Sequence, residues 1–339
     1  MKILSTIFVI IFLAAIAVGT AVGYSLKGKT FRVEGDTYLY VYPGDDAEKV
    51  SGRIDSLANP SAPLSFATVS RLLRRQDRIH SGRYLITPSS DMLGVLRAIS
   101  NHSQQPLNLV VPSVRTVHDL AGRLASRLLV DSLTIDNMLC DSVYCASLGY
   151  TTQTIPSLFI PNTYEIYWDT PAEQLLQRLQ REHAAFWNAE RTAKAEALGL
   201  SEVEVSTLAS IIDSETSYNP EKPRVAGLYL NRLSKGMLLQ SDPTVIFAHG
   251  DFSIRRVMHD HLQIESPYNT YRYAGLPPGP IRIPSIAAID AVLNRERHEY
   301  IYMCAKEDFS GSHNFAVTYA EHSLNARRYA QALNQRGIK

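Results

Sequence analysis

A long uncharged segment near the N-terminus constrains this chain more than any other feature. Residues 3–26 carry no charged side chain and are almost all apolar or small. A helix of that length spans about 36 Å, more than the roughly 30 Å hydrocarbon core of a bilayer. We therefore expect residues 1–26 to form a transmembrane signal anchor. A cleaved signal peptide is the alternative, because residues 17–19 and 21–23 both read AVG and resemble weak cleavage sites.

The composition of the whole chain is that of an ordinary globular protein with almost no net charge. Its 339 residues are 45% hydrophobic, and 34 basic residues face 33 acidic ones. This balance argues against a nucleic-acid partner, since dedicated DNA and RNA binders usually carry a basic stripe. Three cysteines without a CxxC pair give no zinc signature, so we expect neither a metal nor an organic cofactor. Cys140 and Cys145 either form a disulfide in an exported domain or remain buried thiols.

Hydrophobic patterns predict alternating short strands and helices before residue 155, and longer helices after it. A segment rich in proline and aromatic residues at 156–171 marks the junction between the two regions. The predicted strands lie within 30–50 (with a turn at Pro43-Gly44), 81–88 and 107–111, and the predicted helices within 69–75, 91–100, 117–129 and 172–198. We expect Ser89 or Ser90 to cap the helix at 91–100, and Gly199 to end the helix at 172–198.

Glu215 is the residue in the second region that most suggests chemistry. Ser201 and Glu204 form a capping box that starts a helix running into this glutamate. At ~100° per residue, the apolar side chains of residues 208, 211 and 212 lie within about 60° of Glu215, whereas Asp213 lies about 160° away. A carboxyl group on an apolar stripe is partly desolvated, which raises its pKa and suits it to act as a general acid. Asp213 is expected to face solvent or a polar neighbour.

Periodicity alone leaves another interpretation of Glu215 open. A glutamate at a helix end often pairs with an arginine, and Arg224 or Arg232 is available for such a pair. The loops that follow are dense in amide, hydroxyl and phenol groups, which suit sugar rings. The same residue types are also the usual ones in turns.

Six sequence blocks occur in the order and spacing of a known family. They are ASIIDSET at 209–216, VAGLYLNRL at 225–233, GMLLQSDPTVIF at 236–247, SPYNTY at 266–271, GLPPGPI at 275–281, and HNF at 313–315 followed by Glu321-His322. The chain resembles the YceG-like endolytic murein transglycosylases (MltG) from about residue 30 to its end. The resemblance is strong from Leu208 to Asn325 and weak before residue 156.

The resemblance implies a fold, a domain order and a catalytic residue. The fold is α+β, with the membrane helix at 1–26, a small LysM-like α/β glycan-binding module at 30–155 and a larger mixed α+β catalytic YceG-like domain at 156–339. The second acidic residue of the family motif is the catalytic one, and it corresponds to Glu215. The first acidic position is usually Glu in the family and is Asp213 in this chain. The His-Thr-Phe pattern reads His-Asn-Phe, so a role transfers to His313 more readily than to Asn314.

The implied activity is cleavage of the MurNAc–GlcNAc β-1,4 bond of nascent strands without water, which leaves 1,6-anhydroMurNAc ends and limits strand length. The implied place is the bacterial cytoplasmic (inner) membrane, crossed once, with the catalytic domain on the periplasmic side. Peptidoglycan strands are the expected partner, and cell-wall synthases are candidate partners. The candidate substrate-binding residues are Asn231, Gln240, Asp242, Thr244, Tyr268, Asn269, Tyr271 and His313.

Two other functions fit the same residues. A lysozyme-like glycoside hydrolase would need a second carboxylate, for which Asp213, Asp242 and Glu265 are the candidates. A non-catalytic, membrane-tethered peptidoglycan-binding scaffold would need no acid at all.

Overall fold

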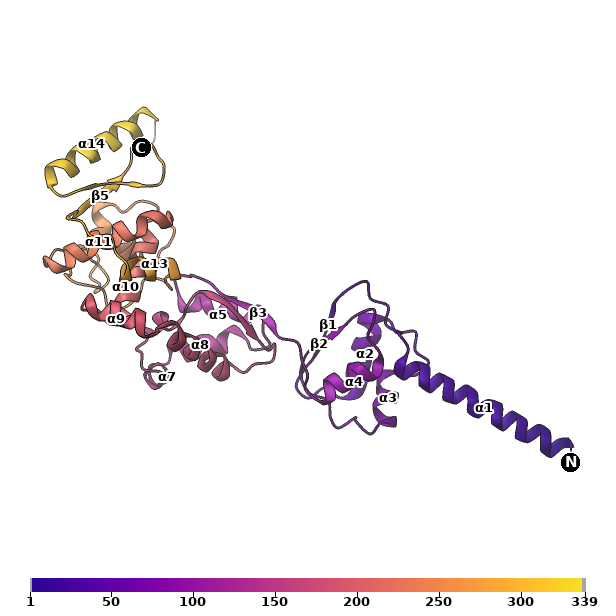
Figure 1. Cartoon of the computed structure of the whole chain (residues 1–339). Coiled ribbons are helices and arrows are strands. Elements are labelled where there is room, and N and C mark those ends of the chain that lie inside the picture. The colour runs from indigo at the N-terminus through magenta and orange to yellow at the C-terminus, as the bar shows by residue number, and fades with distance from the viewer. Residues whose placement is uncertain (1, 337–339) are drawn as a thin grey trace. The chain divides into compact units, whose positions relative to one another are not determined.

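The computed structural model describes residues 2–336 and divides into two compact units (Figure 1). The first unit runs to Leu109 and adds Arg127–Val130 and Tyr164–Pro171. The second contains Val110–Ser126, Asp131–Thr163 and the chain from Ala172 onward. Most of residues 110–155, which the sequence analysis grouped with the N-terminal module, therefore pack within the second unit.

The apolar N-terminal segment forms one continuous helix, α1 (Lys2–Lys27). Residues Ile3–Lys27 are long and apolar enough to cross a membrane, and the apolar stretch is not buried against the rest of the protein. Its isoleucine, leucine and phenylalanine side chains are largely exposed, an arrangement that is unfavourable in water. By length and composition, α1 fits a single-pass membrane anchor.

The first unit has its own core beside a two-stranded antiparallel sheet. Because side chains alternate across a strand, Leu39 and Val41 are buried while Tyr40 is exposed. The predicted turn at Pro43-Gly44 follows the first strand. The elements of this unit are α1, β1 (Thr37–Val41), α2 (Ala47–Ala58), α3 (Phe66–Leu72), β2 (Gly82–Ile86) and α4 (Met92–Ser100). Strand β1 pairs with β2 so that Leu39 lies opposite Tyr84.

Three details of the sequence prediction are corrected. The cap of α4 is Asp91, whose carboxylate accepts a hydrogen bond from the Gly94 amide at 2.6 Å, while Ser90 closes the preceding turn. The single helix expected at 172–198 is two, α8 (Ala172–Phe186) and α9 (Ala189–Ala197), because Asn188 caps the second. Residues 30–50 contain one strand and the start of α2, which the sequence analysis did not predict.

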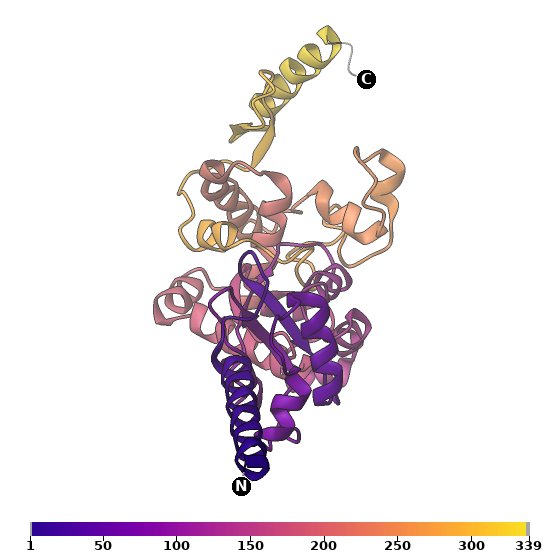
Figure 2. The ribbon, with the colours of Figure 1, turned by 90° about the vertical axis from the view of Figure 1, so that its right-hand side faces the viewer.

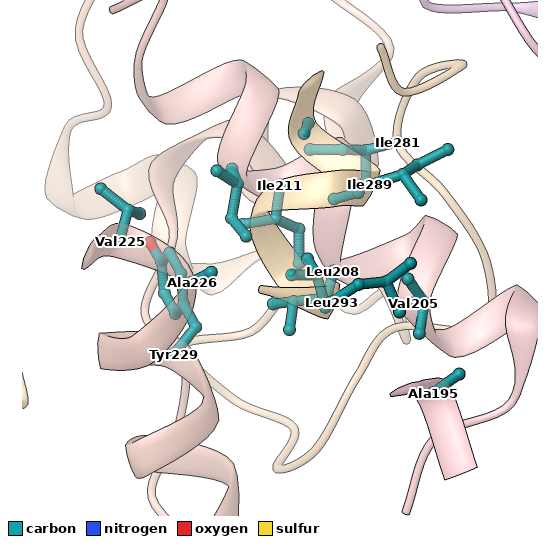
Figure 3. Close-up of a cluster of buried hydrophobic side chains, with 14 of the residues drawn as sticks. Ala195, Val205, Leu208, Ile211, Val225, Ala226, Tyr229, Ile281, Ile289 and Leu293 are labelled. Carbon is teal, nitrogen blue, oxygen red and sulfur yellow. The ribbon is translucent and has the colours of Figure 1, made fainter. Parts of the chain in front are cut away.

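The second unit is built around α10 (Glu202–Glu215). Residues 205–212 of this helix are all buried, since α9, α11 and α13 contact it on different faces. Figure 3 shows Leu208 and Ile211 of α10 between Val225, Ala226 and Tyr229 on one side and Ile281 and Ile289 on the other. The elements that surround α10 are α11 (Lys222–Ser234), α12 (Asp242–His249) and α13 (Ile286–Leu293).

The chain ends in a small hairpin and a helix. Strands β5 (Tyr302–Ala305) and β6 (His313–Ala316) pair antiparallel, and α14 (Tyr319–Gln335) packs against them (Figure 2). The remaining elements are β3 (Leu107–Val111), paired with β4 (Asn162–Ile166), α5 (Val117–Ala125), α6 (Ser132–Cys140), α7 (Ser142–Ser147) and the 3-10 turns η1 (Ile155–Leu158), η2 (Asn219–Glu221) and η3 (His259–Gln263).

Candidate active site

Glu215 is the last residue of the buried helix α10. The helix begins with the predicted capping box, in which the Ser201 hydroxyl accepts from the Glu204 amide and the Glu204 carboxylate accepts from the Ser201 amide. Packing on all sides fixes the axis of α10, and with it the position of its terminal side chain.

One oxygen of the Glu215 carboxyl group accepts two hydrogen bonds. The Tyr229 hydroxyl of α11 donates to Oε1 at 2.7 Å, and the Ser241 hydroxyl donates to the same atom at 2.5 Å. Within residues 2–336, no group donates to Oε2, and no basic side chain reaches either oxygen. Arg224 pairs instead with Glu296, and Arg232 donates to the Leu239 carbonyl. The arginine pair considered from the sequence is therefore not formed.

Burial raises the pKa of the Glu215 carboxyl group, because the charged form loses its hydration. The Ser241 and Tyr229 hydroxyls favour the carboxylate and lower the pKa, Asp242 raises it, and His313 lowers it. Burial outweighs the lowering effects. The group therefore keeps its proton to a higher pH than an exposed glutamate does, and Oε2 is the oxygen without a hydrogen-bond donor among the described residues.

The two hydroxyl donors are themselves held in place. Burial and the nearby Glu215 raise the pKa of Tyr229 well above its ordinary value, so this phenol remains a donor. Ser241 is fixed at its backbone, where its amide donates to Thr270 Oγ1 at 3.0 Å and its carbonyl accepts from Thr244 Oγ1 at 2.7 Å. Gln240, just before it, has a left-handed φ of 52°, a conformation that a non-glycine residue adopts only where its surroundings enforce it.

Glu215 opens onto a pocket of about 390 Å³. One wall comes from α11 and the start of α12, and the other from β5, β6 and α14. On the second wall, the Tyr302 ring stacks on His322 with centroids 5.3 Å apart. The lining residues are Glu215, Leu228, Tyr229, Arg232, Leu239, Gln240, Asp242, Tyr271, Ile301, Tyr302, Met303, Cys304, Ala305, His313, Tyr319 and His322.

His313 enters this pocket from a fixed orientation. The Glu221 carboxylate accepts from the His313 amide at 2.8 Å and lies 2.8 Å from its Nδ1. A carboxylate at Nδ1 favours the tautomer with the proton on that nitrogen, which leaves Nε2 for other contacts. Both side chains are largely buried, and the ring cannot turn without losing the contact between Nδ1 and Glu221.

Asp213 is buried in an ion pair outside the pocket. Its carboxylate accepts from Lys222 Nζ at 2.5 Å, from the Ser285 amide at 2.6 Å and from the Ser285 hydroxyl at 2.9 Å. The expected polar neighbour is thus Lys222, and the Asp213 side chain is only 6% exposed. These bonds tie the end of α10 to α11 and α13, and removing one partner would leave a buried charge unpaired.

The structure divides the candidate substrate-binding residues into two groups. Gln240, Asp242, Tyr271 and His313 line the pocket with Glu215, and the Tyr271 hydroxyl donates to Asp242 at 2.6 Å. The other four side chains make contacts within the protein. Asn231 donates to the His298 and Tyr300 carbonyls, Asn269 to the Leu262 and Ile264 carbonyls, Thr244 to the Ser241 carbonyl, and Tyr268 packs on Phe247.

Sequence reasoning did not single out Tyr229, Ser241, Tyr302 or Tyr319, and it considered Arg232 only as an ion-pair partner of Glu215. Tyr229 falls on the apolar face of α11 and reads as a core residue. Ser241 reads as a turn residue before a helix. Both lie inside the blocks VAGLYLNRL and LQSDPT, so only the resemblance offered a signal for them.

The structure also places the other candidate carboxylates and the residue types that bind metals. Of the carboxylates considered as a partner for Glu215, only Asp242 lines the pocket, since Asp213 is paired and Glu265 contacts Arg272 and Tyr273. In the part of the chain that the structure describes, no three His, Cys, Asp or Glu side chains gather as metal ligands would. Cys140, Cys145 and Cys304 are free thiols, and Cys145 is buried.

Comparisons with known proteins agree on one family. A family model described as the YceG-like family matches residues 39–328. An endolytic murein transglycosylase of Bacillus subtilis is 37% identical over 130 residues, 38% of this chain and 35% of that protein. Proteins of the same name from two Streptococcus pneumoniae strains are 22% identical over 95% of this chain and 64% of theirs. The chain thus spans less than two thirds of these relatives.

A solved structure has a similar fold. The YceG-like protein of Listeria monocytogenes aligns with a TM-score of 0.57 and 24% sequence identity, covering 86% of this chain and 99% of that one. This similarity shows a shared fold and supports the mixed α+β architecture.

Replacing Glu215 with Gln should change how stability depends on pH. Below the ordinary pKa of glutamate, the carboxyl is protonated in both the folded and the unfolded chain. As the pH rises through the window between the ordinary and the raised pKa, the unfolded chain ionises first, so the wild type loses stability. As the pH rises above the ordinary glutamate value of about 4.3, we expect the melting temperature of Glu215→Gln to fall less than that of the wild type.

Thermal denaturation of the detergent-solubilised chain measures this difference. The matched control is Glu299→Gln, which changes an exposed glutamate and should follow the wild-type curve. Parallel curves for Glu215→Gln and the wild type would show that Glu215 carries no raised pKa.

Proposed function

Since the chain belongs to the YceG-like family, we propose that its second unit is an endolytic lytic transglycosylase that cleaves the MurNAc–GlcNAc β-1,4 bond of peptidoglycan strands. The observation that carries this proposal is the Glu215 carboxyl group, whose pKa is raised at the edge of a polar pocket. The name of the Bacillus and Streptococcus relatives, endolytic murein transglycosylase, supports it.

Glu215 serves first as the acid and then as the base. The proton on Oε2 passes to the glycosidic oxygen as the bond from that oxygen to the MurNAc anomeric carbon breaks, and positive charge develops at that carbon. The MurNAc 6-hydroxyl attacks the carbon and gives its proton to the Glu215 carboxylate. The enzyme returns to its starting protonation state, and the products are a GlcNAc 4-hydroxyl end and a 1,6-anhydroMurNAc end.

A single carboxyl group suffices because the nucleophile belongs to the substrate. Glycoside hydrolases usually need a second carboxylate to activate water or to attack. Tyr229 and Ser241 hold Oε1 through both steps, which keeps Oε2 directed at the reacting bond. As the carboxylate forms, the same two donors stabilise its charge.

The remaining pocket residues hold the sugars. Gln240, Asp242, Tyr271 and His313 supply amide, carboxylate, phenol and imidazole groups that match sugar hydroxyls and N-acetyl groups. Tyr302 and Tyr319 on the opposite wall supply aromatic faces for the apolar side of a sugar ring. Asn231, Thr244, Tyr268 and Asn269 act indirectly, by fixing the loops that carry these groups.

The first unit acts as a LysM-like glycan-binding module. Strand β1 and the residue after it present Tyr38, Tyr40 and Tyr42 on the face opposite to its buried side chains. Trp168 packs edge-on against Tyr40 and Tyr42 at 4.9 and 5.0 Å. Half-exposed aromatic rings held rigidly in this way suit sugar stacking.

The helix α1 anchors the protein in the bacterial cytoplasmic membrane, with both units on the periplasmic side. Anchoring places the cut close to newly made strands and limits their length. Cell-wall synthases, which make those strands, are the partner proteins that this position favours.

Glu215→Gln should abolish cleavage. Loss of general acid–base catalysis typically costs about 10²–10⁴-fold in rate, so we expect at least a hundredfold lower kcat on isolated peptidoglycan, with Glu299→Gln near the wild type. Mass spectrometry of the wild-type products should show anhydro ends. Hydrated reducing ends would assign the site to a hydrolase, and full activity of Glu215→Gln would remove the glutamate from the mechanism.

Tyr40→Ala combined with Tyr42→Ala should weaken binding to peptidoglycan. Tyrosine is enriched among the interface residues whose truncation costs more than about 1 kcal/mol, so we expect at least a roughly fivefold higher dissociation constant. Co-sedimentation with intact sacculi measures it, in a Glu215→Gln background that prevents cutting. Leu57→Ala, an exposed apolar residue of the same unit, is the control, and equal binding of all variants would contradict a glycan-binding role for this face.

A further inference from the structure

A second, smaller pocket is lined in part by residues that directly follow or precede residues of the Glu215 pocket in the sequence. Its volume is about 110 Å³. Ser214 lines it and directly precedes Glu215, and Pro243 lines it and directly follows Asp242. Consecutive Cα atoms are about 3.8 Å apart, so both pockets use the ends of α10 and α12. We call it the arginine pocket, lined by Arg115, Ser214, Pro243, Ile246, Phe252, Ile281 and Arg282.

This pocket carries two guanidinium groups and no carboxylate. Among residues 2–336, neither Arg115 nor Arg282 lies at ion-pair distance from an aspartate or glutamate. Two uncompensated positive charges at one small concave site favour an anion.

Arg282 is fixed by neutral partners. Its Nε donates to the Ser113 hydroxyl and its Nη2 to the Ser113 carbonyl, both at 3.2 Å, and its Nη1 lies 3.5 Å from the Asp213 carbonyl. These acceptors orient the guanidinium without neutralising it. Because a planar guanidinium binds a carboxylate through two parallel hydrogen bonds, this orientation prepares it for such a ligand.

Arg115 and Arg282 lie on two chain segments that are joined by a backbone hydrogen bond. The Ile283 amide donates to the Val114 carbonyl at 2.8 Å, which brings the residues on either side close together. The Arg115 guanidinium lies 5.0 Å from the centroid of the Phe252 ring and has no hydrogen-bond partner among the described residues. It is exposed and free to close over an anion bound at Arg282.

We propose that the arginine pocket binds a carboxylate of the peptide stem on the glycan strand, an inference that rests on the proposed function. The cleaved sugar chain carries its negative charges on the peptides attached to MurNAc, not on the rings. A pocket of this size admits a carboxylate group, and two of its lining residues directly neighbour Glu215 and Asp242 in the chain, so the stems of a strand bound at Glu215 would come near it. The pyrophosphate of a lipid-linked strand has similar anionic chemistry, and the experiment separates the two sources.

The experiment compares kcat/KM of the full chain in detergent on three substrates: lipid-free strands with stems, the same strands with the stem carboxylates converted to neutral amides, and lipid-linked strands with unmodified stems. We expect the wild type to favour the unmodified over the amidated strands by roughly threefold to tenfold. Arg115→Gln should bring this ratio close to one, and Arg282→Lys, which keeps the charge but loses the planar fork, should lower it. Added salt should lower the wild-type ratio.

Arg123→Gln, the same change at an exposed arginine of α5 outside the pocket, should keep the wild-type ratio. A wild-type ratio of one, or a ratio that Arg115→Gln leaves unchanged, would overturn the proposal. A preference that follows the lipid link rather than the stem would assign the pocket to pyrophosphate and also overturn it. Failure of the proposed function looks different, because no substrate would then yield anhydro ends.

Discussion

Two hydroxyl groups that meet at one oxygen of Glu215 determine what this site can do. Tyr229 lies in the middle of α11 and Ser241 immediately precedes α12, so the contact exists only where the end of α10 and the start of α12 meet α11. Both donors bind Oε1, which leaves Oε2 without a partner in the described chain. The two carboxyl oxygens therefore differ: Oε1 is held as an acceptor, and Oε2 can carry a proton. In water, nothing distinguishes the two oxygens of a glutamate.

The convergence of these helices depends on buried polar contacts near the site. Asp213, two residues before Glu215, binds Lys222 of α11 and the start of α13 at Ser285. Such a buried ion pair adds little net stability compared with apolar residues of similar size. Its contribution is to fix which helix ends meet, and the adjacent Glu215 then falls at the pocket. The Glu221–His313 pair does the same for the opposite wall.

Local sequence patterns predicted the helix of Glu215 well, and its partners poorly. The capping box at Ser201 and the apolar stripe fixed the start and one face of α10, because both signals act within a few residues. Tyr229 and Ser241 reach Glu215 across 14 and 26 positions, a distance over which periodicity carries no information. The break at Asn188 was missed for a different reason. The helical pattern continues through this residue, but its side chain caps α9 and so separates it from α8. Asn269 and Tyr271 are both polar residues of the block SPYNTY at 266–271, yet only Tyr271 lines the pocket.

The central claim is that Glu215 is protonated at pH values where an exposed glutamate is charged. A ¹³C NMR titration of the glutamate side-chain carboxyl carbons, with the Glu215 signal assigned by its loss in Glu215→Gln, tests this directly. The account predicts a midpoint clearly above the ordinary glutamate value of about 4.3. A midpoint at or below that value would leave the pocket without a proton donor and contradict it.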